Sequence, residues 1–307
     1  MNMKELAYIF VIFILASSIL FFPSFLMNPL EGLFILPQII IGGIIIAGIS
    51  AYLLTPFSLR KVVKPFKSPP EKLVRMVEEL SQKAGLKKMP KLMITETPEI
   101  NAMAYSTLLG PRVVLTRGTV EAWENGKITD DEMRGVIAHE IAHIKHYDPF
   151  KSAFVLSWVS FFETIGELFM IFGSLSATVG AIFGTYGSTD EERSAGGMVL
   201  MLGLLSMIFG FILMIIAKIA SIFSLHYKRR QEYQADELAG KLVMPQVMAN
   251  ALRKVKTLND ELLEKQLASL PYSDRWQMKP RKTSFLDRLF DTHPPFEKRI
   301  KRLEDRT

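Results

Sequence analysis

Four long apolar stretches constrain this chain more than any other feature of its sequence. They cover residues 6–27, 33–57, about 153–172 and about 197–225, and the first two carry no charged side chain. A helix rises about 1.5 Å per residue, so each stretch can cross a hydrocarbon core about 30 Å thick. A cleaved signal peptide is the alternative for the first stretch, but no small-residue cleavage site ends it. The sequence therefore predicts four membrane-spanning helices in two pairs.

Positive charge is distributed unevenly around these predicted spans. The link between the first two spans has no Lys or Arg, whereas basic residues follow the second span at 60–67 and the fourth at 228–230. Basic flanks belong on the cytoplasmic side. We therefore expect membrane hairpins at 1–57 and 153–225, with cytoplasmic segments at 58–152 and 226–307 that assemble one domain. The formal net charge of +6 then needs no nucleic acid partner.

Three charged side chains fall within the third and fourth predicted spans at positions that would be costly in lipid. They are Glu163 and Glu167 in the third span and Lys218 in the fourth. If these spans form an antiparallel hairpin, Glu163 and Lys218 lie at similar depth, so an ion pair is favoured over a transport role.

The polar regions show the patterns of a small α+β domain. Apolar residues recur at helical spacing over 71–84, and short β-prone runs occupy 92–95, 102–108 and 113–116. We expect these runs to form a small antiparallel sheet. A helix with Asp130 as its N-cap is predicted to run through His146, and 269–282 is expected to be a loop.

A His-Glu-x-x-His pattern at 139–143 is the strongest chemical signal. The chain has no cysteine and 5 histidines, so a metal site must use His, Asp or Glu. A spacing of four puts His139 and His143 on one helical face, where both rings reach one zinc ion, and Glu140 can accept a proton from metal-bound water. His146 lies too far along the axis to join them, and we expect a surface or capping role for it.

Zinc needs a third protein ligand, and the second polar region offers two carboxylates. Glu232 and Asp236 are four residues apart on a predicted helix, so one can bind metal while the other holds a ligating histidine. A solvated charged helix face is the alternative, and the residues alone leave it open.

The chain resembles the HtpX-like membrane zinc peptidases, relatives of the type-one CAAX prenyl proteases. The resemblance covers most of the chain and rests on HEIAHIKHYD at 139–148, RRQEYQAD at 229–236, THPP at 292–295 with Arg299 following, and NAMA at 101–104. It implies a zinc ion held by His139, His143 and Glu232, with Glu140 as general base and Asp236 orienting a ligand histidine.

The same resemblance suggests roles for other residues. Asp148 matches the acidic residue that closes the family's helix motif. His293 would lie near the metal, as an oxyanion stabiliser or a group gating the open coordination site, and Arg299 could fix His293 or a substrate carboxylate. Asn101, Ala102, Met103 and Ala104 would bind the substrate backbone as an added strand. The segment 258–289 departs from the pattern and is expected to be a lid or a tether.

The resulting expectation is a mostly α protein. Four transmembrane helices would carry a cytoplasmic α+β zincin-type metalloprotease domain with a small antiparallel sheet. It would hydrolyse misfolded or damaged membrane proteins at the cytoplasmic surface of the plasma membrane, with polypeptides and the lipid bilayer as partners. The alternatives are a prenyl-protein endopeptidase, an intramembrane protease and a non-catalytic zinc scaffold.

Overall fold

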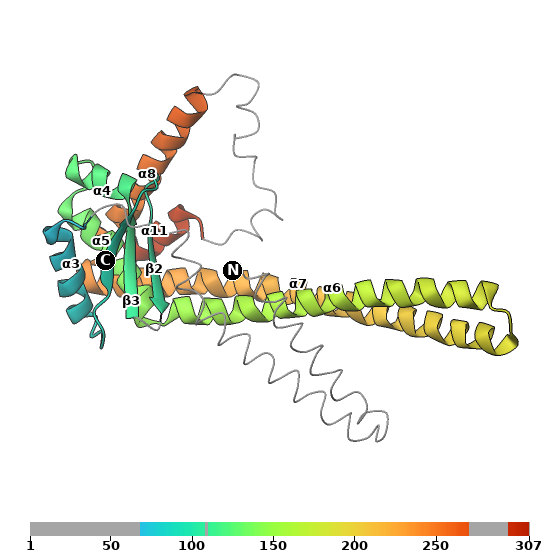
Figure 1. The fold of residues 1–307 in the computed structure, drawn as a ribbon. Coiled ribbons are helices and arrows are strands. Elements are labelled where there is room, and N and C mark those ends of the chain that lie inside the picture. Colours follow the sequence, from blue (N-terminus) through green and yellow to red (C-terminus); the bar gives the residue numbers. More distant parts are fainter. Residues whose placement is uncertain (1–67, 108–109, 270–293, 307) are drawn as a thin grey trace. The chain divides into compact units, whose positions relative to one another are not determined.

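The computed structural model describes residues 68–107, 110–269 and 294–306 (Figure 1). The predicted spans at 6–27 and 33–57, His293 and residues 270–289 of the expected lid lie outside these ranges. The chain divides into two compact units. In the described residues, one unit is Ala153–Ser224, and the other combines residues 68–152 with 225–306.

The described elements are mostly helices. They are the helices α3 (Glu71–Lys83), α4 (Arg117–Glu124), α5 (Asp130–Lys145), α6 (Asp148–Tyr186), α7 (Asp190–Val243), α8 (Pro245–Ser269) and α11 (Phe296–Glu304), and the strands β1 (Lys91–Thr95), β2 (Ala102–Thr107) and β3 (Gly110–Thr116).

The sheet is mixed, so the prediction of a purely antiparallel sheet is wrong. Its strand order is β1-β3-β2, with β1 parallel and β2 antiparallel to β3. Among the described strands, β2 and β3 follow one another in the chain and pair antiparallel. The link between β1 and β2 carries the chain past the position of β3, so β1 and β3 run in the same direction. Sequence neighbours often pair but need not, and the strand pattern alone does not reveal this crossover.

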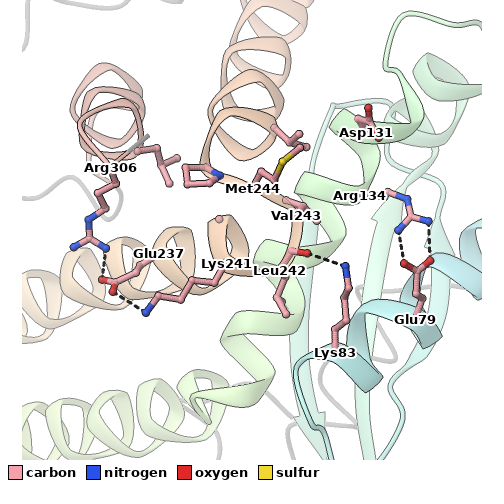
Figure 2. A pocket seen from close by; sticks show the side chains of 14 residues that line it. Glu79, Lys83, Asp131, Arg134, Glu237, Lys241, Leu242, Val243, Met244 and Arg306 are labelled. Carbon is pink, nitrogen blue, oxygen red and sulfur yellow. Dashed lines mark hydrogen bonds and ion pairs between the residues drawn. The ribbon is translucent and has the colours of Figure 1, made fainter.

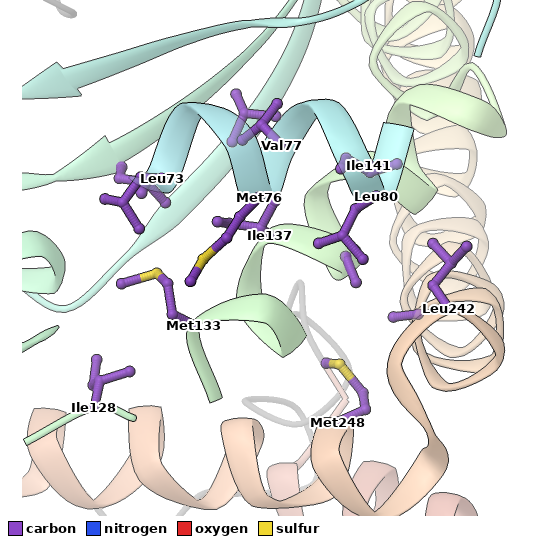
Figure 3. Close-up of a cluster of buried hydrophobic side chains, with 14 of the residues drawn as sticks. Leu73, Met76, Val77, Leu80, Ile128, Met133, Ile137, Ile141, Leu242 and Met248 are labelled. Carbon is purple, nitrogen blue, oxygen red and sulfur yellow. The ribbon is translucent and has the colours of Figure 1, made fainter. Parts of the chain in front are cut away.

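In the unit that combines residues 68–152 with 225–306, the hydrophobic core surrounds α5 (Figure 3). Met133, Ile137 and Ile141 of α5 are fully buried, and α3 packs on them through Leu73, Val77 and related residues at helical spacing. Gly135 allows α8 to approach closely, since a Cβ atom there would lie 2.7 Å from the Cβ of Ala251. A helix buried on several sides is held rigidly, which suits the element that carries the paired histidines.

Local contacts cap both ends of α5. Its N-cap is Thr129 rather than Asp130, because Thr129 and Glu132 form a reciprocal capping box. The helix ends at Lys145 with His146 as its C-cap. Tyr147 then adopts a φ of 58°, and α6 starts at the next residue, Asp148. This sharp reversal brings Asp148 back beside the last turn of α5.

The helical hairpin of the other unit is packed backbone to backbone. We call its close-packed glycines the glycine seam: Gly166, Gly173 and Gly180 of α6, and Gly196, Gly203 and Gly210 of α7. A Cβ atom on Gly173 would lie 2.6 Å from the carbonyl oxygen of Gly203, and one on Gly180 would lie 2.2 Å from the nitrogen of Leu200. Small residues at such contacts are typical of helices that associate in membranes.

Two described helices are long and apolar enough to cross a membrane. The segments are Val159–Tyr186 and Asp190–Val243. The third predicted span was expected to end near residue 172, but α6 continues to Tyr186, because glycines and serines after that point lower the hydropathy without breaking the helix. The acidic residues at 190–192, expected in the link, form the first turn of α7 instead. There Glu192 accepts hydrogen bonds from the N–H groups of Ser188 and Thr189.

The predicted ion pair within the hairpin is confirmed. Lys218 Nζ lies 3.5 Å from Glu163 Oε1. Pairing lowers the cost of placing these charges in an apolar hairpin.

The unit that contains α5 also has a cavity of about 830 Å³, lined by α3, α5, α11 and the junction of α7 with α8 (Figure 2). Most of its charged groups are bonded to each other or to backbone: Arg134 pairs with Glu79, and Lys83 donates to the carbonyl of Leu242. None of the residues that carry the zinc or substrate predictions lines it, so it is not a candidate for the chemistry.

Candidate metal centre

Three ligand atoms from two helices converge on one point. His139 and His143 lie one turn apart on α5, and Glu232 comes from the last third of α7. The two Nε2 atoms are 3.1 Å apart, and the Glu232 carboxylate oxygens lie 3.5 Å from His139 Nε2 and 3.6 Å from His143 Nε2. Ligands at about 2.1 Å from a tetrahedral zinc ion are separated by about 3.4 Å. The three side chains therefore fit one metal site.

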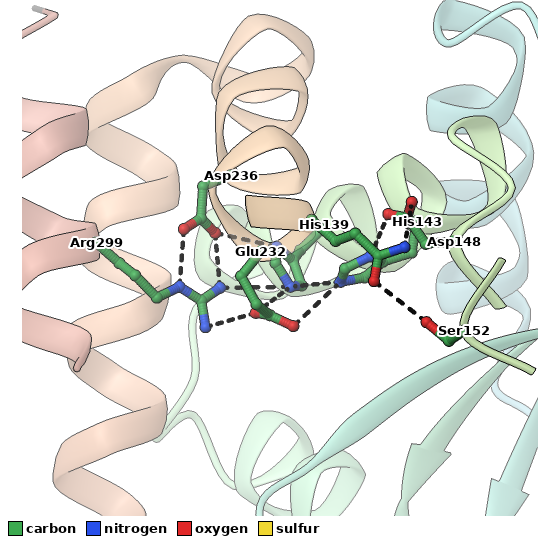
Figure 4. Close-up of polar contacts among 8 residues, drawn as sticks. His139, His143, Asp148, Ser152, Glu232, Asp236 and Arg299 are labelled. Carbon is green, nitrogen blue, oxygen red and sulfur yellow. Dashed lines mark hydrogen bonds and ion pairs between the residues drawn. The ribbon is translucent and has the colours of Figure 1, made fainter. Parts of the chain in front are cut away.

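The far nitrogen of each histidine faces a carboxylate (Figure 4). His139 Nδ1 is 3.1 Å from Asp236 Oδ1, and His143 Nδ1 is 2.9 Å from Asp148 Oδ2. A carboxylate at Nδ1 favours the tautomer with its proton there, which leaves the Nε2 lone pair free. Two lone pairs facing one another at this separation repel unless a proton or a metal ion lies between them.

Each carboxylate is held in turn by an outer partner. Arg299 of α11 donates from Nε and Nη2 to the two oxygens of Asp236, both at 2.7 Å, and its Nη1 lies 2.9 Å from Glu232 Oε2. Gln231 of α7 donates from Nε2 to Asp148 Oδ1 at 3.0 Å. The ligand helix α5 is thus tied to α6, α7 and α11 through the residues around the metal.

The charge balance of the centre favours a cation. Four buried carboxylates surround it, and Arg299 is the one buried cation among the described residues. The carboxylates belong to Glu140, Asp148, Glu232 and Asp236. With His139 neutral, as a metal ligand must be, three negative charges are left uncompensated, and a divalent ion would reduce that excess to one. Buried charges that lack partners are costly, so the arrangement is suited to Zn²⁺.

The pKa values of His139 and Asp236 also indicate a site that favours positive charge. Burial alone would lower the pKa of His139, but hydrogen bonds to Asp236 and Glu232 outweigh it and raise the pKa to about 10. Burial alone would raise the pKa of Asp236, but hydrogen bonds from Arg299 and His139 hold it below its usual range. The site therefore stabilises positive charge at the point where the ligand atoms meet.

Glu140 lies next to His139 in sequence and lines the same cavity. This cavity has a volume of about 790 Å³ and is bounded by α5, α7, α8 and the strand β2. Glu140 is 7% exposed, and its carboxylate has no hydrogen-bond partner among the residues that the structure describes. An unengaged carboxylate beside a metal site, facing a cavity, is free to accept a proton.

The edge strand β2 forms another wall of this cavity. Thr116 N donates to the carbonyl of Asn101 at 3.1 Å, so residue 101 pairs with β3 through its backbone. Hydrogen-bonding residues alternate along an antiparallel strand, so the backbone groups of Ala102 and Ala104 face away from β3. The Asn101 side chain accepts from the N–H of Ala102. The N–H and C=O of Ala104 thus point to the open edge.

The start of β2 is fixed by α8. The side-chain amide of Asn259 accepts from Ile100 N at 3.2 Å and donates to Ile100 O at 2.9 Å. This two-point contact holds the chain just before the strand. It also gives the first part of the segment 258–289 a defined role, because 258–269 forms the end of α8.

Residues 67–307 match the family described as Peptidase family M48. The chain belongs to this family. A Protease HtpX homolog of Methanocaldococcus jannaschii is 33% identical over 237 residues, covering 75% of this chain and 73% of the relative. Protease HtpX homologs of Syntrophobacter fumaroxidans and Persephonella marina are 34% and 32% identical, and the second alignment covers 91% of this chain and 94% of the relative.

Family membership and the ligand cluster together identify this M48 protein as a zinc metallopeptidase, a hydrolase. The predicted family and enzyme class are therefore confirmed. His146 is absent from the ligand cluster among the described residues, as expected, and caps α5. Arg299 contacts Asp236 and Glu232, and its predicted contact with His293 falls outside the described residues.

Sequence reasoning gave no role to three residues that shape the site of this M48 peptidase. They are Ser152, Gln231 and Asn259. Each is a neutral polar residue without a recognisable motif of its own. Gln231 carries one signal that could have been used: it follows the buried positions 196, 203, 210, 217 and 224 at the same spacing of seven.

Proposed function

We propose that this M48 peptidase is an integral-membrane endopeptidase that hydrolyses misfolded or damaged membrane proteins at the cytoplasmic membrane surface. The observation that carries the catalytic part is the Glu140 carboxylate, buried beside three converging zinc ligands and free of hydrogen bonds to the described residues. Three protein ligands with a position open to water are typical of catalytic zinc, whereas structural sites have four.

In the proposed reaction, Glu140 receives a proton from the attacking water and passes it to the leaving amine of the substrate. His139, His143 and Glu232 would hold the zinc ion, and Asp236 and Asp148 would keep the two Nε2 lone pairs directed at it. Bound zinc lowers the pKa of water and polarises the peptide carbonyl. His293 is proposed to stabilise the oxyanion or to gate the site.

The edge of β2 is proposed to align the substrate. A peptide added as a strand would pair with the outward backbone groups of Ala104 and the carbonyl of Ala102. Asn101 and Met103 complete the segment, and all four residues line the cavity with His139 and Glu140. Backbone pairing gives affinity with little side-chain selectivity, which suits a peptidase of broad specificity.

The membrane setting of the proposal is supported by the two helices that are long and apolar enough to span a bilayer. Charge placement favours a cytoplasmic position for the site, because the basic residues at 228–230 directly precede Gln231 and Glu232 on α7. An active site anchored in this way would meet membrane proteins before soluble ones. The proposed partners are polypeptide substrates and the lipid bilayer, with no nucleic acid.

The test is zinc-dependent cleavage of an unfolded protein such as casein by the detergent-purified chain and by Glu140→Gln. We expect Glu140→Gln to lower kcat by more than about 100-fold while zinc content stays at one per chain, because the amide cannot accept a proton. Glu132→Gln, at an acidic position in the first turn of the same helix, is the control and should remain active.

Two other outcomes would redirect the proposal. If both Glu140→Gln and the wild type bind zinc and neither cleaves any unfolded or membrane protein, the catalytic proposal fails for this substrate class. Cleavage restricted to prenylated C-terminal peptides would favour a prenyl-protein endopeptidase.

A further inference from the structure

Gln231 is an unusual residue for its position on α7. The five positions that precede it at intervals of seven are all buried and all small: Gly196, Gly203, Gly210, Ala217 and Ser224. Gln231 is 4% exposed and is much larger. Ser152 likewise continues the spacing of Val159, Gly166, Gly173 and Gly180 on α6. Packing alone therefore does not account for a long polar side chain here.

Both polar ends of the Gln231 side chain are engaged in hydrogen bonds. The Ser152 hydroxyl donates to Oε1 at 3.2 Å, and Nε2 donates to Asp148 Oδ1 at 3.0 Å. Reversing the amide would place its oxygen against a buried carboxylate oxygen, which is repulsive. The contacts with Ser152 and Asp148 therefore fix one orientation of the amide.

The contacts lead directly to a zinc ligand. Asp148 Oδ1 accepts from Gln231, and its other oxygen, Oδ2, lies 2.9 Å from His143 Nδ1. Asp148 is 4% exposed, and Gln231 and His143 are its hydrogen-bond partners among the described side chains. Removing the amide would leave one carboxylate oxygen buried without a donor and free to rotate away from the histidine.

We propose that Gln231 and Ser152 are positioning residues for zinc. They hold Asp148 so that His143 keeps its proton on Nδ1 and directs Nε2 at the metal. This inference deepens the proposed function, since it concerns the same zinc site. Two neutral residues, one in the first turns of α6 and one in the last third of α7, would thus fix the orientation of the His143 ring. Partners that orient a metal-bound histidine typically change metal affinity 10–100-fold when removed.

The experiment compares Gln231→Met with the wild type in the full-length, detergent-purified protein. Methionine keeps the length of the side chain and removes both hydrogen bonds. We expect zinc to bind about 10–100-fold more weakly, measured by competition with a chelator of known affinity. Gln234→Met, the same change at an exposed position one turn further along α7, is the matched control and should bind zinc as the wild type does.

Two further readouts separate positioning from a general structural role. A structural defect would lower the melting temperature equally with and without zinc, whereas a positioning defect reduces the increment that zinc adds. The absorption spectrum of the Co²⁺-loaded protein should also change, because it reports the orientation of the ligands. Unchanged zinc affinity and an unchanged cobalt spectrum in folded Gln231→Met would overturn the proposal.

Ser152→Ala provides a second, milder variant if Gln231→Met does not fold. It frees the amide to reverse and should weaken zinc binding several-fold, and wild-type affinity would again contradict the proposal. Failure of the positioning proposal can be distinguished from failure of the proposed function. Weak zinc binding by Gln231→Met with no cleavage by the wild type would support positioning alone. Cleavage by the wild type with normal zinc binding by both variants would support the function alone.

Discussion

The two histidine ligands are supported in parallel ways that differ in charge. His139 is backed by Asp236 and then by Arg299, whereas His143 is backed by Asp148 and then by Gln231. We call these the charged arm and the neutral arm. The charged arm depends on α11, near the end of the chain, and the neutral arm depends on the first turns of α6.

The difference lies in what each outer partner can do when the site changes. A guanidinium only donates, cannot lose its charge, and here pairs with both Asp236 and Glu232. An amide and a hydroxyl can each reverse and exchange donor for acceptor. The charged arm should therefore stabilise the zinc-free protein strongly, but its hydrogen bonds cannot rearrange when the site changes. The neutral arm should contribute less to stability, and its hydrogen bonds can rearrange.

Removing the charge of the charged arm should have the largest effect. Arg299→Met removes the guanidinium that pairs with buried Asp236 and Glu232 and leaves protonated His139 as the cation they share. Breaking a buried pair from one side costs about 3–5 kcal/mol. We expect a loss of that size in the unfolding free energy of the zinc-free protein, measured by guanidinium unfolding in detergent with fluorescence detection. Zinc should restore part of it.

Arg302→Met is the control for this change, because Arg302 lies on the same helix and is exposed. Its effect should be small, limited to its contact with the Tyr233 ring. A loss below about 1 kcal/mol in Arg299→Met would show that water or a rearranged side chain replaces the guanidinium, and would remove the distinction between the arms.

Neutralising the two carboxylates separately tests the difference in adaptability. In Asp148→Asn, Gln231 and Ser152 can reverse their hydrogen bonds, so zinc affinity should fall by no more than about 10-fold. In Asp236→Asn, the new amide N–H must face either Arg299 or His139, and both are hydrogen-bond donors. Zinc affinity should therefore fall by a factor that approaches about 100. Chelator competition measures both. Equal losses would contradict the comparison.

The protonation of His139 makes the charged arm sensitive to pH in the zinc-free protein. The pKa of His139 is raised from 6.5 in the unfolded chain to about 10 in the fold. The resulting stabilisation is complete below pH 6.5 and is lost as pH rises through 10, with a slope of at most about 1.4 kcal/mol per pH unit. Unfolding curves of chelator-treated protein over this range measure it, and His139→Gln should flatten the slope.

The parts of the molecule that depend on local spacing were predictable from sequence. His139, Glu140 and His143 lie within one helical turn, so their chemistry follows from a single element. Glu232 is distant in sequence, and the spacing of the carboxylates left it and Asp236 as equal candidates. Resemblance to a family selected Glu232, and the ligand distances agree with a metal site that includes it.

What could not be predicted depends on contacts between segments. The parallel pairing of β1 with β3 follows from how one link crosses the sheet, which the strand pattern does not encode. Ser152 and Gln231 meet because α6 and α7 pack in a particular register, and Arg299 reaches Asp236 only because α11 packs on α8. The seven-residue spacing marks the positions of Ser152 and Gln231, but only the structure shows that their side chains bond to one another and to Asp148.

The glycine seam also restricts how the length of this hairpin can vary during evolution. Gln231 falls in the same seven-residue register as the seam on α7, and Ser152 does so on α6. Deleting one residue from a helix rotates everything beyond it by about 100°. We therefore expect insertions and deletions in α6 after Ser152 and in α7 before Gln231 to occur in multiples of seven residues. They should also occur in both helices at once. Relatives with shorter or longer hairpins would differ by whole, paired repeats.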